Sequence, residues 1–259
     1  MHARSLVIAL VPFVLPVFGC GGGDSGTDDG GTGVDMAEAQ QCPAVAPACT
    51  DEQIQDLPLY KTAAPATRTV TTTMDGTDFV SEINAQGGGL SPTEAYVYAK
   101  FTPTGLQKVD LGDEEAFASS AWDIAFRRFV IRLNSGVSGP SCVQGGRTAV
   151  GDYSTIAAVP AGIVLGPESY YSSACQAVSD NSGLGSPGTL LSTFWTYKGC
   201  VSMTNSVYVI HTADGKDLKL TVEHYYTEDV QTACDTTGTM SASQEAAAGH
   251  IGVRWAYLP

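Results

Sequence analysis

The chain has 259 residues and a formal net charge of −14, because 27 acidic side chains outnumber 13 basic ones. This acidic balance argues against nucleic acid or an anionic membrane surface as a partner, since phosphate binding requires clustered Lys and Arg. Only 15% of the residues are charged and the seven cysteines form no CxxC pair, which argues against a helical cytosolic protein, a zinc ribbon or a thioredoxin-type site and favours an oxidising compartment.

The first 20 residues predict an export signal that ends at a lipidation site. Arg4 supplies a short positive start, and the apolar run that follows it is too short to span a bilayer. The residues Leu-Pro-Val-Phe-Gly before Cys20 resemble a bacterial lipobox, which implies cleavage before Cys20 and diacylation of that residue. The alternative is an ordinary signal peptide, with Cys20 paired in a disulfide.

Lipidation of Cys20 leaves six cysteines, which permit three disulfides. They are Cys42, Cys49, Cys142, Cys175, Cys200 and Cys234. A short Pro/Ala loop separates the first two and predicts the pair Cys42–Cys49. Pairing the others in sequence order predicts Cys142–Cys175 and Cys200–Cys234.

The segment after Cys20 predicts a flexible tether. Residues 21–41 hold seven Gly, four Asp, one Glu and no basic residue, so the segment cannot bury enough apolar surface to offset its ordering entropy. We therefore expect a signal peptide at 1–19, a lipidated Cys with a tether at 20–59, and a folded domain at 60–259.

Strand signals recur through the predicted domain. Residues 67–74 are β-branched, residues 94–101 form a second strand candidate, and residues 250–257 alternate apolar and other side chains. Residues 205–211 and 217–226 read as a hairpin, with Asp214 and Gly215 in its turn. Helix signals are confined to 113–118 and 241–248, and residues 176–192 read as a long loop. The sequence therefore predicts an all-β fold with one antiparallel domain.

The strongest strand signal, at 119–134, changes its apolar face part of the way along. Trp122, Ile124 and Phe126 share one parity, whereas Phe129, Ile131 and Leu133 share the other. A β-bulge near residues 127–128 explains the switch, because one extra residue restores the inward face. The alternative is a strand that is buried on both sides.

The same stretch carries Asp123, Arg127 and Arg132 among apolar residues. Unpaired buried charge is costly, so these residues predict a paired structural network. Contact with a ligand is the alternative role.

No catalytic motif is found. The chain contains no GxSxG elbow, HExxH or P-loop, and the histidines that remain after signal cleavage, His211, His224 and His250, have no helical ligand spacing. We therefore expect a protein that is not an enzyme. The sequence places His211 at the surface beside a turn. His224 shares the parity of Leu220 and Val222 and is expected on their side of the strand.

Two blocks carry a family resemblance. Residues 122–128 with 131–136 and Gly139, and residues 208–215 with Lys219, Tyr225 and Tyr226, resemble the HmuY family of bacterial haem-binding lipoproteins, over residues 65–259. The resemblance implies an all-β, non-enzymatic haemophore at the outer membrane or cell surface. It implies haem as the bound cofactor, a TonB-dependent outer-membrane receptor as the partner, and contact with the membrane through the lipid anchor only.

The family's haem ligands cannot be carried over to this chain. They are two histidines, or methionines in some relatives, from a region that corresponds to residues 150–203; this chain has no His there and only one Met. His, Met, Tyr and Cys can all ligate haem iron, so the nearest candidates are Met203, Tyr197, His211 and His224, followed by Tyr170 and Tyr171. The alternatives are that all of these are packing residues, and that the fold binds another small molecule or a protein.

Overall fold

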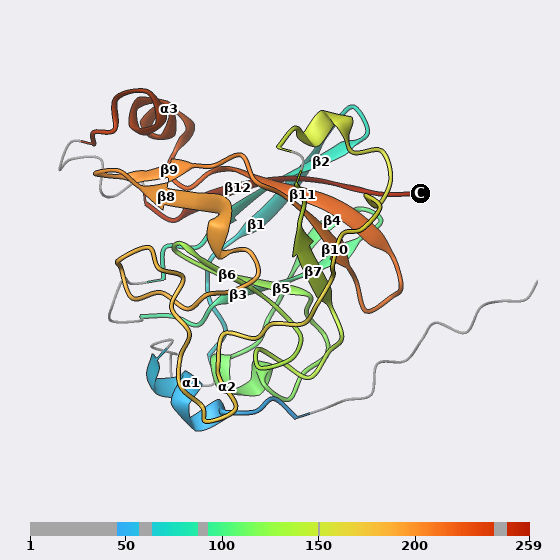
Figure 1. Ribbon diagram of the computed structural model, residues 1–259, viewed down its shortest axis with the longest axis vertical. Helices are drawn as coiled ribbons and strands as arrows, with labels where there is room; N and C mark the ends of the chain where they lie inside the picture. Colours follow the sequence, from blue (N-terminus) through green and yellow to red (C-terminus); the bar gives the residue numbers. More distant parts are fainter. Residues whose placement is uncertain (1–45, 57–63, 88–92, 150, 241–247) are drawn as a thin grey trace, which may run out of the picture. The chain divides into compact units, whose positions relative to one another are not determined.

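The computed structural model describes residues 46–56, 64–87, 93–149, 151–240 and 248–259, without the side chains of 54–56. Antiparallel strands dominate this part of the chain, which confirms the predicted all-β fold (Figure 1). Three helices are described: α1 (Thr50–Asp56), α2 (Asp113–Ala116) and α3 (Glu228–Thr237). The longest has ten residues, and none of the described helices has the length and apolar character needed to cross a membrane.

The largest sheet has six strands, and these include the first and the last described strands of the chain. Its strand order is β1 (Val70–Asp75), β2 (Asp78–Asn84), β12 (His250–Tyr257), β11 (Asp217–His224), β10 (Val207–His211) and β7 (Gln144–Arg147). The predicted strand at 250–257 and the predicted hairpin are both confirmed, and Gly215 takes a positive φ of 74° in the hairpin turn.

A four-stranded sheet and a separate hairpin complete the described strands. The sheet order is β4 (Gly105–Val109), β3 (Val97–Thr102), β5 (Ile124–Arg127) and β6 (Val130–Leu133), and the hairpin pairs β8 (Trp195–Tyr197) with β9 (Val201–Met203). The sequence did not predict β2, β4, β7, β8 or β9, because most of them are short and lack a clear alternation.

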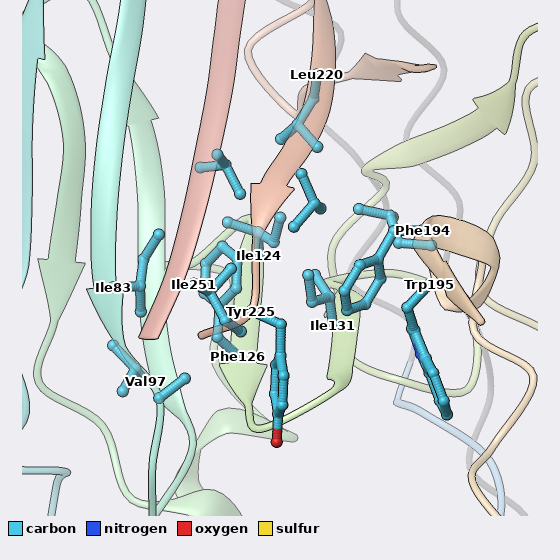
Figure 2. Close-up of a cluster of buried hydrophobic side chains, with 14 of the residues drawn as sticks. Ile83, Val97, Ile124, Phe126, Ile131, Phe194, Trp195, Leu220, Tyr225 and Ile251 are labelled. Carbon is cyan, nitrogen blue, oxygen red and sulfur yellow. The ribbon is translucent and has the colours of Figure 1, made fainter. Parts of the chain in front are cut away.

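The main core is formed by the inner faces of the two larger sheets. Ile83, Leu220 and Ile251 come from the six-stranded sheet, and Val97, Ile124 and Phe126 come from the other (Figure 2). A second cluster covers the opposite face of the four-stranded sheet, where Tyr98 and Ala125 pack with Trp122 and Tyr170. Strands β3 and β5 are therefore buried on both faces.

The expected β-bulge at residues 127–128 is wrong, because the segment is a hairpin. Strands β5 and β6 are joined by a two-residue turn in which Arg128 has φ 49°. The register pairs Phe126 with Ile131 and Ile124 with Leu133. Even positions of β5 and odd positions of β6 therefore share one face of the sheet. The turn contains neither Gly nor Asn, the residues that usually mark a turn of this kind.

The disulfides correct two of the three expected pairings. Cys49 is bonded to Cys175 across 126 residues, which excludes both Cys42–Cys49 and Cys142–Cys175. The predicted Cys200–Cys234 bond is confirmed. Cys142 is also disulfide-bonded, and Cys20 and Cys42 lie outside the described residues. Proximity in sequence misled the pairing because a disulfide is decided by how the folded chain packs.

Helix α1 lies inside residues 20–59, the range expected to be tether. Its Gln53 is fully buried; the side-chain amide donates to the backbone oxygens of Ala48 and Val137 and accepts from the Tyr170 hydroxyl at 3.0 Å. These contacts and the Cys49–Cys175 bond attach the described end of the expected tether to the domain. The expected helix at 241–248 falls almost entirely outside the described residues, whereas α2 matches the expected helix at 113–118.

Candidate functional site

The hairpin of β8 and β9 brings two of the candidate ligand residues together. Its register places Trp195 opposite Met203 and Tyr197 opposite Val201. Directly opposed residues, and residues two apart on one strand, share a face, so Tyr197 and Met203 lie on the same face at diagonal positions. The sequence did not predict this juxtaposition, because neither strand had been recognised.

This face of the hairpin runs from the core out to solvent. Trp195 is buried and packs against Phe129, with ring centroids 5.2 Å apart. Met203 is half-buried against the main core, whereas Tyr197 is 51% exposed. Trp195 belongs to the main core together with Phe194 and Tyr225 (Figure 2). The result is an apolar floor with a thioether and a phenol above it.

The free edge of β9 is fixed to α3 and to the residues after β11. The Cys200–Cys234 disulfide joins the hairpin to α3, and the Met203 amide donates to Asp235 at 2.9 Å. The Val201 amide donates to the Tyr226 hydroxyl at 3.1 Å. These attachments hold the hairpin face that carries Tyr197 and Met203 in one orientation.

The two candidate histidines lie at opposite ends of the β10–β11 hairpin. His211 pairs with Asp217 beside the turn, and its Nδ1 lies 2.8 Å from the Asp217 carboxylate. His224 is the last residue of β11, seven positions beyond Asp217, which corresponds to roughly 23 Å along the strand. The two imidazoles therefore cannot ligate the same metal ion.

His224 does not share the side of Leu220 and Val222, contrary to the sequence-based expectation. A register shift between Val222 and His224 is the reason, since Val222 pairs with Val253 of β12 and His224 pairs with the adjacent Gly252, which leaves Glu223 as the extra residue. The His224 ring covers Gly252, where an added Cβ would approach the ring to 2.1 Å. The ring therefore sits on the outer face of the sheet, next to Glu82 of β2.

Both ring nitrogens of His224 have partners. Nδ1 lies 2.7 Å from the Tyr226 carbonyl oxygen and 2.9 Å from that of His250, and Nε2 lies 3.1 Å from the Glu82 carboxylate. Burial lowers the pKa of His224, but the hydrogen bond and the negative charge of Glu82 outweigh it, so the pKa lies above its ordinary value.

The remaining tyrosine candidates belong to the second core cluster. Tyr170 is fully buried, donates to Gln53, and packs on Tyr171 with ring centroids 5.6 Å apart. Neither ring is exposed enough to meet a large ligand in this conformation.

The charged residues of the 122–134 block form the paired structural network that the sequence predicts. Arg132 is fully buried and donates to the Tyr98 hydroxyl at 2.6 Å, and Tyr98 donates to Asp113 at 2.9 Å. The Arg127 guanidinium lies over the Tyr96 ring, 4.3 Å from its centroid.

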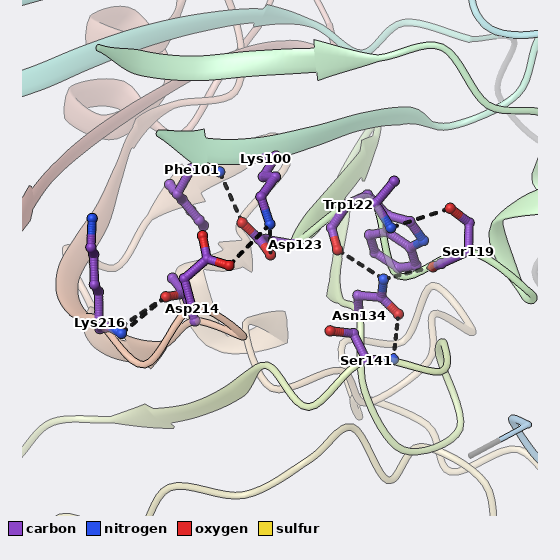
Figure 3. Close-up of polar contacts among 11 residues, drawn as sticks. Lys100, Phe101, Ser119, Trp122, Asp123, Asn134, Ser141, Asp214 and Lys216 are labelled. Atoms are coloured by element: carbon purple, nitrogen blue, oxygen red, sulfur yellow. Dashed lines mark hydrogen bonds and ion pairs between the residues drawn. The ribbon is translucent and has the colours of Figure 1, made fainter. Parts of the chain in front are cut away.

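Asp123 is buried at the edge of the same block. The Lys100 ammonium lies 3.7 Å from Asp123 and 3.7 Å from Asp214 (Figure 3). Burial raises the pKa of Asp123 to about 6, although Lys100 and the Phe101 amide both favour its charged form. These contacts connect the four-stranded sheet to the β10–β11 turn, which is a structural role.

Comparison with known proteins identifies a family over more than half of the chain. A family model described as HmuY protein matches residues 92–238, a range that contains every described element from β3 to α3. No curated protein sequence matches the chain.

Solved structures give weaker similarities. A lipoprotein of Bacteroides fragilis NCTC 9343 has a TM-score of 0.44 and 15% identity, over 72% of this chain and 94% of that one. A HmuY-like haem-binding protein of Bacteroides vulgatus ATCC 8482 has a TM-score of 0.43 and 18% identity, over 72% and 95%. The apo HmuY analog of Tannerella forsythia has a TM-score of 0.36 and 15% identity, over 75% and 98%. Since these TM-scores lie below 0.5, the family assignment rests on the family model.

Proposed function

The chain belongs to the HmuY family, and from this premise we propose that it is a non-enzymatic surface lipoprotein that binds haem for iron acquisition. The match of the family model to residues 92–238 is the observation that carries the proposal. This range includes the β8–β9 hairpin and the long connection between β7 and β8, residues 148–194, which is called the excursion below.

We propose the solvent-accessible end of this hairpin face, which carries Tyr197 and Met203, as the haem contact. Tyr197 and Met203 supply a phenol and a thioether, two groups that can ligate haem iron. The apolar floor that includes Trp195 and Phe129 suits a flat macrocycle, since ligand sites are mostly apolar with a few placed polar groups. His211 and His224 lie away from this face, because His211 is beside the β10–β11 turn and His224 is on the outer face of the six-stranded sheet.

The proposed attachment to the cell surface depends on residues outside the described part of the chain. A signal peptide at 1–19 would direct export, and a lipid on Cys20 with the tether at 20–59 would hold the domain at the outer membrane. A TonB-dependent receptor in that membrane is the proposed partner, because haem bound at the surface still has to be transported.

Haemin titration of the full-length protein tests this proposal. We expect a shifted Soret band that saturates at micromolar haemin. The variants Tyr197→Phe and Met203→Ala should each weaken binding by at least about tenfold, as expected for the loss of a direct ligand. His211→Gln is the matched control, because it removes a ligand-type side chain at the far end of the β10–β11 hairpin.

The absence of a spectral change at micromolar haemin would overturn the haem proposal. It would favour the second candidate, a HmuY-type surface lipoprotein that binds another small molecule or a protein partner. The observation favouring this alternative is the absence of histidine from residues 150–203.

A further inference from the structure

A groove on the outer face of the six-stranded sheet lies outside the proposed haem surface. It has a volume of about 430 Å³ and is bounded on one side by α3. The ionisable residues that line it are Glu82, Glu223, His224, Glu228, Asp235 and Arg254. Four carboxylates thus face one guanidinium and one imidazole.

The backbone fixes the tautomer of His224 in this groove. Its Nδ1 lies within 2.9 Å of the carbonyl oxygens of Tyr226 and His250, and a carbonyl oxygen can only accept a hydrogen bond. Nδ1 therefore carries the hydrogen, and in the neutral ring the lone pair of Nε2 points at the Glu82 carboxylate. A backbone carbonyl on the second ring nitrogen is the arrangement that orients metal-binding histidines.

A lone pair facing a carboxylate requires a positive group between them. A proton on Nε2 is one solution and gives an ordinary ion pair. A metal ion is the other, and the spacing accommodates it. With Zn–N and Zn–O bonds of about 2.0–2.2 Å and a tetrahedral angle of about 109°, the two ligand atoms lie roughly 3.3–3.6 Å apart, so the exposed Glu82 side chain has to move outward by a few tenths of an ångström. The observed separation of Nε2 and the Glu82 oxygen is 3.1 Å.

The rest of the groove favours a cation. Arg254 is engaged outside the His224–Glu82 pair, because its guanidinium donates to Glu223 and lies 2.9 Å from Asp75. Glu228 and Asp235 keep the α3 side of the groove negative, which raises the local concentration of cations. An imidazole with a carboxylate suits Zn²⁺ or Cu²⁺, whereas Ca²⁺ and Mg²⁺ prefer oxygen ligands alone.

We propose that His224 Nε2 and Glu82 bind a divalent transition-metal ion, with Zn²⁺ as the representative case. Water completes its coordination, so the metal exchanges readily with solvent. Elsewhere in the described residues, Cys49, Glu52 and Cys175 bring three ligand-type atoms within 4.8 Å, but the two sulfurs form a disulfide. The His224–Glu82 site does not depend on haem binding.

Calorimetric titration of the chelator-treated, haem-free full-length protein with ZnCl₂ at pH 7.5 tests the proposal. We expect one saturable site, weakened by at least about tenfold in His224→Gln and in Glu82→Gln. His211→Gln is the matched control, because it removes the other His–carboxylate pair and should leave the affinity unchanged. Circular dichroism checks that each variant is folded. Since Glu82 is exposed, Glu82→Gln keeps the test valid if His224→Gln fails to fold.

Electron paramagnetic resonance of the Cu²⁺-loaded protein supplies a second readout. We expect hyperfine coupling to a single imidazole nitrogen that disappears in His224→Gln and persists in His211→Gln. The proposal is overturned if the wild-type chain shows no saturable Zn²⁺ binding, if binding is unchanged in Glu82→Gln, or if His211→Gln abolishes it. None of these outcomes bears on the haemin titration, so the two proposals fail separately.

Discussion

At the scale of single residues, Glu168 connects the excursion between β7 and β8 to the core through two hydrogen bonds. Its side chain is fully buried and accepts the amide of Leu133 in β6 at 2.8 Å and the amide of Leu190 at 3.0 Å. Burial raises the pKa of Glu168 to about 7, against the opposing effects of these two amides and of Arg132. The folded state therefore binds this proton more tightly than the unfolded state does.

We expect the free energy of unfolding to fall as the pH rises from about 4.5 to about 7, since ionised Glu168 is disfavoured in the folded state. The contribution is on the order of 3 kcal/mol. Glu168→Gln should be less stable than wild type at pH 5, because the NH₂ group of Gln replaces one of the two oxygens that accept the Leu133 and Leu190 amides. The difference in stability should shrink toward pH 8, because the wild type loses stability as the pH rises.

Urea unfolding of Glu168→Gln and wild type at pH 5 and pH 8 measures this effect, and Asp152→Asn is the control for an exposed loop carboxylate. A difference in stability that does not change with pH would show that Glu168 keeps an ordinary pKa.

At the scale of elements, the two described disulfides close loops of very different length. Cys49–Cys175 spans 126 residues and joins α1 to the excursion, whereas Cys200–Cys234 spans 34 residues and joins the β8–β9 hairpin to α3. In the chain-entropy account, a disulfide stabilises a fold by restricting the unfolded chain, and it does so more for longer loops.

Removal of the long-range disulfide should therefore destabilise the protein more. The chain-entropy account gives a loss of stability of about 5 kcal/mol for the double variant Cys49→Ala, Cys175→Ala, and of about 4 kcal/mol for the double variant Cys200→Ala, Cys234→Ala. Urea unfolding of the two double variants measures the order. The opposite order would mean that the packing of α3 on the hairpin contributes more than loop closure.

At the scale of the whole molecule, we propose that a lipid on Cys20 anchors the described domain to the membrane. We expect the protein expressed in a Gram-negative host to partition into the detergent phase of Triton X-114, because two acyl chains bind membranes stably. Cys20→Ala should move the protein to the aqueous phase, and Ser25→Ala, in the same segment, should not. Incorporation of radiolabelled palmitate into Cys20→Ala would rule out Cys20 as the anchor, and this readout does not depend on whether the apolar signal is cleaved.

Much of the β framework is predictable from local patterns. The β10–β11 hairpin carries its own turn signal at Asp214 and Gly215, and β12 alternates along its whole length, so both were recognised. The β5–β6 turn was missed because Arg128 adopts a positive φ without the residue types that normally signal it. Helix α3 was missed because three of its ten residues are Thr, which has low helix propensity.

The candidate site was less predictable than the fold. The residue types that could ligate haem iron can be read from the sequence, but their neighbours depend on strand register. The register shift at the end of β11 moved His224 to the outer face, and the unrecognised β8–β9 hairpin brought Tyr197 next to Met203.

The sequence by itself determined that the chain is all-β, that it resembles the HmuY family, and that its charge does not suit nucleic acid. These properties follow from composition, alternation and short motifs, which are local. Only the tertiary structure decided that Cys49 pairs with Cys175, that His211 and His224 are separated, and that His224 faces Glu82. Each of these depends on contacts between distant segments, and no local pattern encodes which distant segment packs against which.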